Sequence, residues 1–378
     1  MLLRRHRHIA VLSFLLLATP LAVGLVWPDN PDWIKKEARM PAAAPVLPEN
    51  LEAVLAFPEH ADAYLNDHFG LRQKMIRLHK DLTKPLLFEA NQAAIIGKSG
   101  RIFALGDDMV LQSAGQVVRK EKVSRVADML GAMRDALDRR GVRFLVAIPP
   151  NSSTIYPDDL PNWAQNPGKK TEYDLLLEDL DGRGVKAIDL RPALRAARAD
   201  GPTYYIYDLH WNARGALAGF NAIVEADGHP DWRIDAASAL GPLAVHKPED
   251  IARFLGIEDR AIETSETLNL RSKGETENLS EGSMPDHVVT SNRLGPTIMV
   301  IGDSFTTEYF PIMLSQHVGR AIWMHHRHCG FDWSWIDRLR PDEVWWTPVE
   351  RFLVCECTQR PKGLAGKTPE ARREASGN

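Results

Sequence analysis

The sequence has few cysteines, no excess of charge of one sign and almost no long hydrophobic runs. Three cysteines in 378 residues cannot build a disulfide-dense scaffold. The 46 Lys and Arg residues against 50 Asp and Glu residues give a formal charge of −4, which excludes a globally basic surface for nucleic acid. A single uninterrupted apolar stretch excludes a polytopic membrane protein. With 44% hydrophobic and 25% charged residues, the chain has the composition of a folded protein of at most about two domains.

The one apolar run lies at the start of the chain. Residues 9–27 are almost entirely apolar, and they follow Arg4, Arg5 and Arg7. At about 1.5 Å per residue, such a run is just long enough to cross a hydrocarbon core about 30 Å thick. Basic residues stay on the cytoplasmic side, so the rest of the chain is predicted to be translocated. We therefore expect an N-terminal transmembrane anchor over residues 1–27, with a cleaved signal peptide as the alternative.

The three cysteines would reach an oxidising compartment if the chain is translocated. Cys355 and Cys357 are separated by one residue and make a poor pair with each other. A disulfide from Cys329 to one of them is compatible with the spacing and leaves one thiol over. Free buried cysteines are the alternative.

Changes in composition divide the chain into segments. Residues 28–50 contain five prolines and a run of alanines, which is typical of an extended linker. A folded domain is predicted over residues 51–360, followed by a disordered tail at 361–378. Within the domain, residues 228–292 are polar and irregular, so we expect an insertion with weak strands there.

Short apolar segments alternate with helical patterns through the domain. After a hairpin at 94–103, the pattern predicts strands or strand-like runs at 143–148, 185–190, 204–207, 297–301, 321–324 and 343–346, and helices at 117–139, 173–180, 213–226, after 305 and near 332. This alternation is typical of an α/β domain with a mostly parallel sheet and helices on both faces. In such sheets, reactive groups collect at the carboxyl ends of the strands.

Three loops in such positions carry polar residues. They are Pro-Pro-Asn-Ser-Ser at 149–153, Asp-Leu-His-Trp at 208–211 and Gly-Asp-Ser-Phe at 302–305. Because the carboxyl ends of parallel strands lie at one edge of a sheet, we expect these loops to meet.

The Gly-Asp-Ser-Phe loop follows an apolar strand and opens a helix. Gly302 permits a sharp turn, and the start of the helix places free amides near the Ser304 hydroxyl. A serine in this position can act as a nucleophile while its own N–H helps to hold an oxyanion. The alternative is that Asp303 or Ser304 only caps the helix.

The Asp-Leu-His-Trp loop supplies what such a serine needs. A serine hydroxyl requires a base near neutral pKa, and that base requires a partner on its other nitrogen. Asp208 lies two positions before His210 and can fold back to accept its Nδ1–H. A lone histidine is often structural, but the three residues together favour a triad that performs covalent acyl transfer.

The two motifs together resemble the alginate-type polysaccharide O-acetyltransferases of the SGNH-hydrolase-like group, the AlgJ/AlgX type. Further similar stretches lie at 95–100, 155–157, 160–161, 188–192, 341–342 and 350–353, and the resemblance spans roughly residues 50–355. It implies an SGNH-hydrolase-like (flavodoxin-like) sheet in which the His motif precedes the Ser motif, the reverse of ordinary SGNH hydrolases. It also implies that Ser304 is the nucleophile, His210 the general base and Asp208 the residue that orients it.

The chain departs from this group in the loop at 149–153. Related sequences often carry a lysine where this chain has Asn151-Ser152-Ser153, so the second oxyanion donor is unassigned. Asn151 is a candidate because its amide can donate, and a turn residue is the alternative. Arg214 and Tyr309 lie close in sequence to the two motifs and are candidates for contacting a sugar acid. Solvated or core positions are the alternatives for both.

A dense set of histidines raises the question of a metal. His317, His325, His326 and His328 precede Cys329, but their spacing matches no zinc pattern. Adjacent His325 and His326 on a strand would also point to opposite faces. We expect neither a metal nor a cofactor.

The sequence thus predicts a periplasmic O-acetyltransferase anchored to the bacterial inner membrane. It would transfer acetyl groups to hydroxyls of an alginate-like exopolysaccharide through an acyl-serine. Besides the polysaccharide acceptor, the resemblance implies a membrane-bound acyltransferase partner, because acetyl-CoA is cytoplasmic; no nucleic-acid partner is expected. A carbohydrate acetyl esterase and a non-catalytic polysaccharide-binding subunit of an export complex stay open as alternatives.

Overall fold

The computed structural model describes residues 94–248, 251–255, 257 and 261–355, with a few isolated residues before them. Contacts divide the chain into two units, residues 1–91 and 92–378, and the elements below belong to the second. The predicted anchor and linker lie almost entirely outside the described residues, and so do the tail and the predicted domain boundaries at 51 and 360. Among the residues described, no helix is long and apolar enough to span a membrane.

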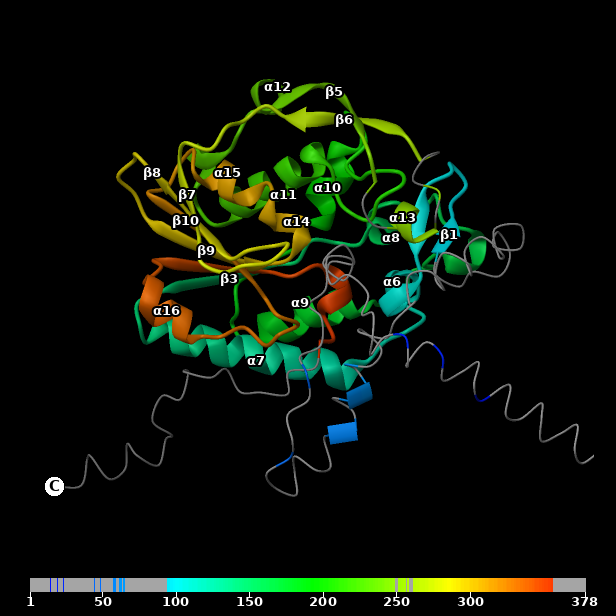
Figure 1. Cartoon of the computed structure of the whole chain (residues 1–378), viewed down its shortest axis with the longest axis horizontal. Coiled ribbons are helices and arrows are strands. Elements are labelled where there is room, and N and C mark those ends of the chain that lie inside the picture. The colour runs from blue at the N-terminus through cyan, green and yellow to red at the C-terminus, as the bar shows by residue number, and fades with distance from the viewer. Residues whose placement is uncertain are drawn as a thin grey trace, which may run out of the picture. The chain divides into compact units, whose positions relative to one another are not determined.

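A seven-stranded sheet forms the framework of this unit (Figure 1). Its strands stand in the order β4-β3-β11-β9-β10-β8-β7. The five from β4 to β10 are parallel, whereas β8 and β7 continue the sheet antiparallel, so the sheet is mixed. Their bounds are β3 (Arg143–Ala147), β4 (Ala187–Ile188), β7 (Gly274–Asn278), β8 (His287–Ser291), β9 (Thr297–Gly302), β10 (Arg320–His325) and β11 (Glu343–Thr347).

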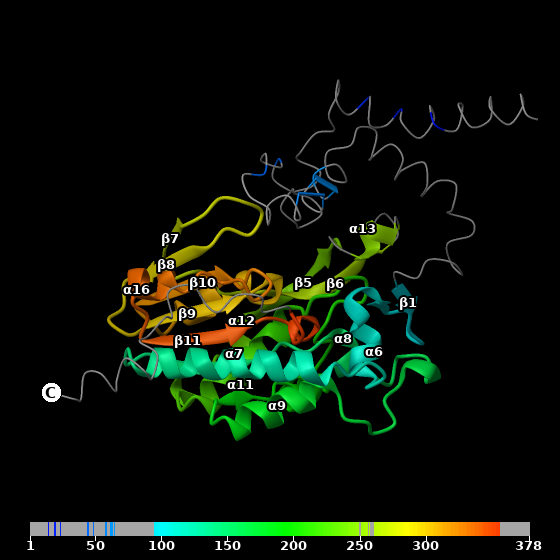
Figure 2. The ribbon, with the colours of Figure 1, turned by 90° about the horizontal axis from the view of Figure 1, so that it is seen from below.

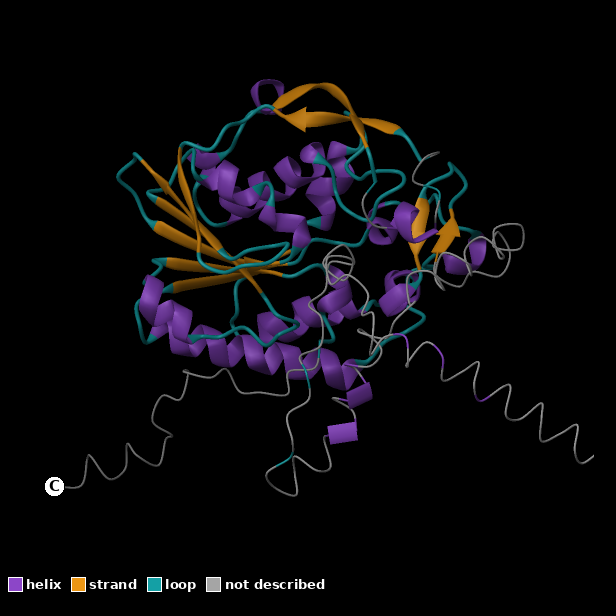
Figure 3. Ribbon diagram, viewed as in Figure 1, coloured by secondary structure: helices purple, strands orange, loops and turns teal. Residues whose placement is uncertain are grey.

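Helices cover both faces of the sheet, as Figure 3 shows. One face packs against α7 (Lys120–Asp138), α9 (Glu172–Gly182) and α16 (Ser334–Leu339), and Figure 2 shows α7 lying along the strands. The other packs against α10 (Arg191–Ala197), α11 (Ala213–Ala226), α14 (Ser304–Thr307) and α15 (Phe310–Leu314).

Neighbouring side chains of the central strands enter opposite cores, because successive side chains of a strand alternate in direction. Trp345 packs in the core under α11 and α15, and Trp346 packs in the core under α7 and α16. Both are almost completely buried. Such strands are apolar throughout, which is why the sequence pattern finds them. The predicted α/β architecture is confirmed.

Shorter elements surround the sheet. β1 and β2 form the predicted hairpin, and β5 and β6 form a second two-stranded ribbon. The remaining elements are β1 (Ala94–Ile96), β2 (Ile102–Ala104), η1 (Gly106–Asp108), α6 (Met109–Ser113), α8 (Ser152–Ile155), η2 (Asn162–Ala164), η3 (Pro230–Trp232), α12 (Ala236–Ala239), β5 (Leu240–His246), α13 (Ile251–Leu255), β6 (Glu263–Leu268) and η4 (Glu350–Phe352).

Residues 228–292 are not an irregular insertion. They contain β5 and β6, and their last two strands, β7 and β8, belong to the central sheet. β7 reads Gly-Glu-Thr-Glu-Asn and is polar because it is an edge strand, where charged side chains face solvent. The buried apolar residues of β8 are Val288 and Val289, and they pack in opposite cores. Strands this polar or this short give a weak periodic signal.

The predicted strand-like run at 204–207 is not a strand of the sheet. It forms only an isolated bridge from Tyr204 to Trp211. Side chains take several of its backbone groups: the N–H groups of Ile206 and Tyr207 donate to the Glu263 carboxylate. Arg101 donates to the carbonyl oxygens of residues 204 and 205. Groups bound in this way are not available for a continuous ladder with a strand of the sheet.

Two expectations about the segment after β10 are settled. Cys329 forms a disulfide with Cys355, with Cα atoms 6.0 Å apart; Cys357 lies outside the described residues. His325 and His326 do not point to opposite faces, since their ring centroids are 5.1 Å apart and the rings are within 20° of parallel. β10 ends at His325, and residues 327–329 then turn with positive φ angles of 54°, 51° and 66°.

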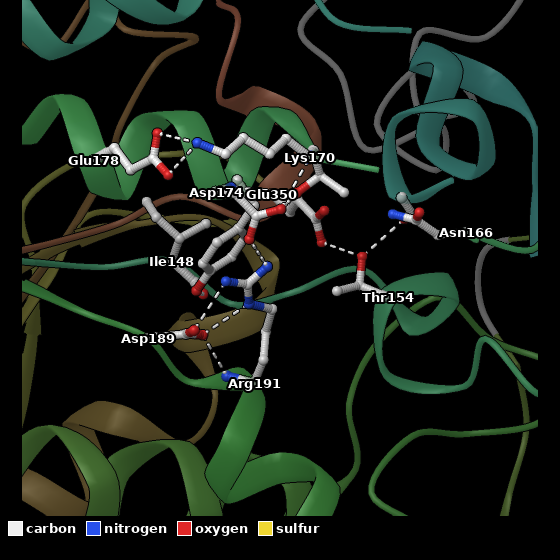
Figure 4. A network of polar contacts seen from close by, with 12 residues as sticks. Ile148, Thr154, Asn166, Lys170, Asp174, Glu178, Asp189, Arg191 and Glu350 are labelled. Atoms are coloured by element: carbon white, nitrogen blue, oxygen red, sulfur yellow. Dashed lines mark hydrogen bonds and ion pairs between the residues drawn. The ribbon is translucent and has the colours of Figure 1, made fainter. Parts of the chain in front are cut away.

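Glu350 is a fully buried carboxyl group at the start of η4 (Figure 4). Its Oε2 accepts hydrogen bonds from the Asn151 N–H and the Thr154 hydroxyl, both at 2.7 Å. Burial raises the pKa of Glu350 to about 7, although these two hydrogen bonds act to lower it. Nearby, Arg191 pairs with Asp174 and Asp189. Glu350 therefore ties the loop after β3 to the segment after β11 while resisting ionisation.

Replacing Glu350 with Gln tests this burial. The folded-state pKa lies above the ordinary value of 4.5, so the stability that the carboxyl contributes is present below about pH 4.5 and is lost as pH rises through 7. From pH 5 to pH 8, the free energy of unfolding of Glu350→Gln should therefore rise relative to wild type, by up to about 3 kcal/mol. Urea denaturation at both pH values measures the difference. The exposed Glu178→Gln is the control, and an unchanged difference for Glu350→Gln would contradict the prediction.

At two helical glycines, an added methyl group should change the free energy of unfolding in opposite directions. A Cβ at Gly215 in α11 would lie 2.1 Å from the carbonyl oxygen of Thr203, so Gly215→Ala should lower the free energy of unfolding by about 1–3 kcal/mol. At Gly131 in α7 the nearest heavy atom is 3.5 Å away, so Gly131→Ala should raise it by roughly 0.5–1 kcal/mol. Chemical denaturation of the two variants checks both signs. A Gly215→Ala variant as stable as wild type would refute the close approach.

Candidate active site

Ser304 stands at the first position of α14, immediately beyond the end of β9. Asp303 is the cap of this helix: its Oδ1 accepts from the Phe305 N–H at 2.9 Å, and its Oδ2 accepts from the Val349 N–H at 2.8 Å. The Ser304 hydroxyl is therefore not needed for capping. Gly302 is required because a Cβ there would lie 2.2 Å from the Thr306 hydroxyl. The sequence thus produces a tight strand-to-helix turn with a partly exposed serine at its top.

The loop from Thr203 to Asn212 carries the histidine. The Tyr205 N–H donates to the His210 carbonyl, and the Asn212 N–H donates to Thr203, which closes the loop on itself. Asn212 then caps α11 by accepting from the Gly215 N–H at 3.0 Å.

The Trp211 side chain attaches this loop to the serine turn. The indole Nε1–H of the buried Trp211 donates to the Phe305 carbonyl at 2.6 Å. This bond joins residues 94 positions apart, and it lies one residue from His210 on one side and one residue from Ser304 on the other.

The structure brings the predicted Asp208, His210 and Ser304 into one hydrogen-bonded chain. His210 Nδ1 is 2.6 Å from Asp208 Oδ1, and His210 Nε2 is 2.8 Å from Ser304 Oγ. Burial would raise the pKa of Asp208, but the hydrogen bonds from His210 and His246 outweigh it and hold that pKa well below 3.8. A carboxylate that stays charged keeps the proton on Nδ1, so Nε2 is free to accept the serine proton.

His246 is a residue that the sequence analysis missed. It ends β5, and its Nε2 lies 3.4 Å from Asp208 Oδ2, on the carboxylate oxygen that His210 Nδ1 does not contact. Its ring stacks on Tyr205, with centroids 3.6 Å apart and planes within 10° of parallel. No motif marks this histidine, because it lies in the polar ribbon, 38 positions from Asp208.

A hollow of about 260 Å³ adjoins His246. It lies between the β5–β6 ribbon and the helices that follow Ser304. Its lining includes two carboxylates, those of Glu266 and Glu308, and two phenol rings, those of Tyr205 and Tyr309. The lining residues are Tyr205, Ala244, Val245, His246, Ser265, Glu266, Thr267, Leu268, Leu270, Glu308, Tyr309 and Ile312.

The other three candidates are placed differently. Tyr309 lines the hollow, its hydroxyl is 3.3 Å from that of Tyr205, and burial raises its pKa, so it stays protonated. Arg214 forms a two-point ion pair with Glu266, at 2.7 and 2.8 Å, which joins α11 to β6. The side-chain amide of Asn151 donates to Gln112 at 3.3 Å, and its backbone N–H donates to Glu350.

The Ser304 N–H, which the sequence analysis names as an oxyanion donor, is available in the structure. Among the described residues, none accepts a hydrogen bond from the Ser304 N–H, whereas the next amide, of Phe305, is taken by Asp303. This N–H opens α14, so it can donate to an oxygen that develops negative charge beside Oγ.

One group of potential metal ligands lies away from this site. Among the described residues, one group of three places its ligand atoms within 4.8 Å of one another: Asp227, His229 and Glu343. Glu343 begins β11, so the group lies at the opposite end of the strands from Ser304. Arg143 already pairs with both carboxylates and Lys186 with Asp227, so positive charge is in place there.

Comparison with known proteins identifies the family of the chain. Residues 96–356 match the model of the family described as "SGNH hydrolase-like domain, acetyltransferase AlgX". The chain is 25% identical over 155 residues to the "Probable alginate O-acetylase AlgJ" of Pseudomonas aeruginosa (41% of this chain, 38% of that protein) and 26% identical over 174 residues to that of Azotobacter vinelandii (46% and 42%). It therefore spans about two fifths of these relatives.

Among solved structures, the O-acetyltransferase domain of Pseudomonas putida AlgJ has the same fold. The TM-score is 0.51 at 16% sequence identity, over 73% of this chain and 98% of that one. The family model covers more than half of the chain, and the resemblance found in the two sequence motifs is confirmed. The chain belongs to the SGNH hydrolase-like acetyltransferase family of the AlgJ/AlgX type.

Proposed function

We propose that the protein transfers acetyl groups to hydroxyls of an alginate-like exopolysaccharide through an acyl-serine formed on Ser304. The observation that carries the proposal is the hydrogen-bonded chain from Asp208 through His210 to Ser304. Family membership favours acetyl transfer, and two relatives are named as probable alginate O-acetylases.

The first half-reaction forms the acyl-serine. His210 Nε2 takes the hydroxyl proton as Ser304 Oγ attacks the carbonyl carbon of the acetyl donor, and the Ser304 N–H donates to the resulting oxyanion. The intermediate collapses when the bond to the leaving group breaks, and His210 returns its proton to that group. Asp208 stabilises the imidazolium through the Nδ1–H bond of 2.6 Å.

The second half-reaction uses the same atoms in reverse order. A sugar hydroxyl gives its proton to His210 Nε2 and attacks the acyl carbon; the bond to Ser304 Oγ then breaks, and Oγ takes the proton back. Water in place of the sugar would release acetate, so the alternative of a carbohydrate acetyl esterase differs only in the acceptor.

We also propose where this reaction takes place and what supplies the acetyl group. The basic residues and apolar run at the N-terminus support an anchor in the bacterial inner membrane, with the domain in the periplasm. Acetyl-CoA is cytoplasmic, so a membrane-bound acyltransferase partner would supply the acetyl group.

A serine-directed fluorophosphonate tests the nucleophile. We expect mass spectrometry to find one labelled peptide, which contains Ser304, and Ser304→Ala to lose both the label and about 10³-fold or more of the hydrolysis rate of a chromogenic acetyl ester. Ser238→Ala, on the exposed helix α12, is the matched control and should behave as wild type. A label on another residue, or an unchanged rate for Ser304→Ala, would refute the assignment.

A second experiment separates transfer from hydrolysis. The enzyme is incubated with alginate oligosaccharides and the acetyl ester: acetylated oligosaccharide supports a transferase, and acetate alone supports the esterase.

His246 has a positioning role in this proposal. It holds the Asp208 oxygen that His210 Nδ1 does not contact, so the carboxylate cannot rotate away from the imidazole. His246→Phe keeps a ring on Tyr205 and removes Nε2. We expect kcat for the acetyl ester to fall by about tenfold, at a roughly unchanged KM, as for loss of one charge-assisted hydrogen bond.

A second variant, His246→Gln, distinguishes this positioning role from a purely structural one. His246→Gln places an amide that can still donate to Asp208, and it should recover part of the lost kcat. The acid limb of the pH–rate profile should move in His246→Phe and return in His246→Gln, because the hydrogen bond from residue 246 helps to lower the pKa of Asp208, which is coupled to His210. Equal kcat and equal profiles in both variants would remove His246 from the mechanism.

A further inference from the structure

Arg351 is a half-buried cation, and no anion among the described residues pairs with it. It lies on η4, and its guanidinium carbon is 5.0 Å from the centroid of the Phe352 ring and 5.7 Å from that of the Phe305 ring. Among the described residues, no carboxylate, carbonyl or hydroxyl lies within ion-pair or hydrogen-bond distance of it. Other arginines near the site are paired: Arg214 with Glu266, and Arg101 with Asp159 and two carbonyls.

Arg351 lies beside the proposed catalytic residues. The ring of Phe305, next to Ser304, is also 5.0 Å from the ring of His210, so the guanidinium and the imidazole pack against the same aromatic ring. Arg351 and Leu209 line one small pocket with Asn151, Ser152 and Ser153. This pocket shares no lining residue with the hollow at His246.

The backbone around Arg351 is fixed on both sides. Glu350 precedes it and binds the loop after β3, and the disulfide from Cys355 to Cys329 follows it. Cation–π contacts hold the side chain itself, because the guanidinium is attracted to the electron-rich ring faces. Held in this way, the five N–H donors of Arg351 form a prepositioned fork for a carboxylate.

The buried imidazole of His326, close to Arg351, carries no charge at pH 7. The rings of His326 and His328 lie 4.7 and 5.1 Å from the Phe352 ring. Burial, and then the charges of His325, His328 and Arg351, lower the pKa of His326 well below its usual value, so it is neutral at pH 7. A neutral sugar ring would offer nothing to balance the guanidinium, whereas a uronic acid carries one carboxylate per ring.

We propose that Arg351 is the residue that selects an acidic acceptor: it binds the carboxylate of a uronate unit and places a hydroxyl of that chain at the acyl-serine. This inference rests on the proposed function, because it concerns the acceptor of the same reaction. It adds a specificity-determining residue and the chemical class of the ligand it takes.

Binding to an inactive enzyme tests the site without turnover. In the Ser304→Ala background, calorimetry should show that Arg351→Gln weakens binding of an alginate hexasaccharide by about tenfold or more, as for a lost charge-assisted hydrogen-bonded pair. Binding of an uncharged mannohexaose should not change. Arg338→Gln is the matched control, since Arg338 also lies on an aromatic ring, that of Trp335, but on the exposed side of α16. Equal alginate affinity with and without Arg351 would overturn the proposal.

Turnover gives the second measurement. With Ser304 intact, Arg351→Gln should raise KM for the alginate acceptor by about tenfold, more than it lowers kcat. The KM of Arg351→Lys should lie between those of wild type and Arg351→Gln, because lysine keeps the charge but loses the guanidinium fork. A parallel loss with charged and uncharged acceptors would overturn the selectivity. If wild type transfers acetyl to neither acceptor while alginate binding still depends on Arg351, the proposed function fails and the carboxylate site stands.

Discussion

The hydrogen bond from the Trp211 indole to the Phe305 carbonyl is the constraint on which the candidate site depends. It joins the histidine loop to the serine turn across 94 residues of sequence, at one position from each reacting side chain. The indole is fully buried and packs against the Phe305 and Phe310 rings, so the bond is protected from water. A contact of 2.8 Å between His210 and Ser304 needs this accuracy, because a shift of 1 Å would break it.

The β5–β6 ribbon supports the same loop from the other side. Glu263 of β6 accepts from the N–H groups of residues 206 and 207, and His246 of β5 lies on Asp208. A segment that has the composition of an insertion thus holds the carboxylate end of the hydrogen-bonded chain, while Trp211 holds its serine end. These two attachments help to fix a loop that no strand of the sheet contains.

Much of the fold and of the candidate site could be predicted from the sequence, and the parts that could not be predicted have physical causes. The parallel strands are apolar on both faces, so β9 and β11 are evident from the sequence, and Ser304 and Asp208-x-His210 are recognisable because each motif is local. His246 is not recognisable, since it reaches Asp208 only through the three-dimensional approach of a polar segment that carries no periodic signal. Arg351 lies in the stretch 350–353 that resembles the family, but no local pattern assigns it a role. The strand-like run at 204–207 misleads because Glu263 and Arg101, distant in sequence, take its backbone groups.

Recognition of the acceptor and exclusion of water are one problem at this site. In the proposed mechanism, His210 would activate water or a sugar hydroxyl through the same nitrogen. Transfer therefore requires binding energy that keeps a sugar hydroxyl, and not water, at the acyl-serine. In the proposed reaction, the Arg351 guanidinium beside Phe305 would supply that energy to an acidic chain and not to a neutral one. If so, selectivity for an acidic polysaccharide is what would favour transfer over hydrolysis.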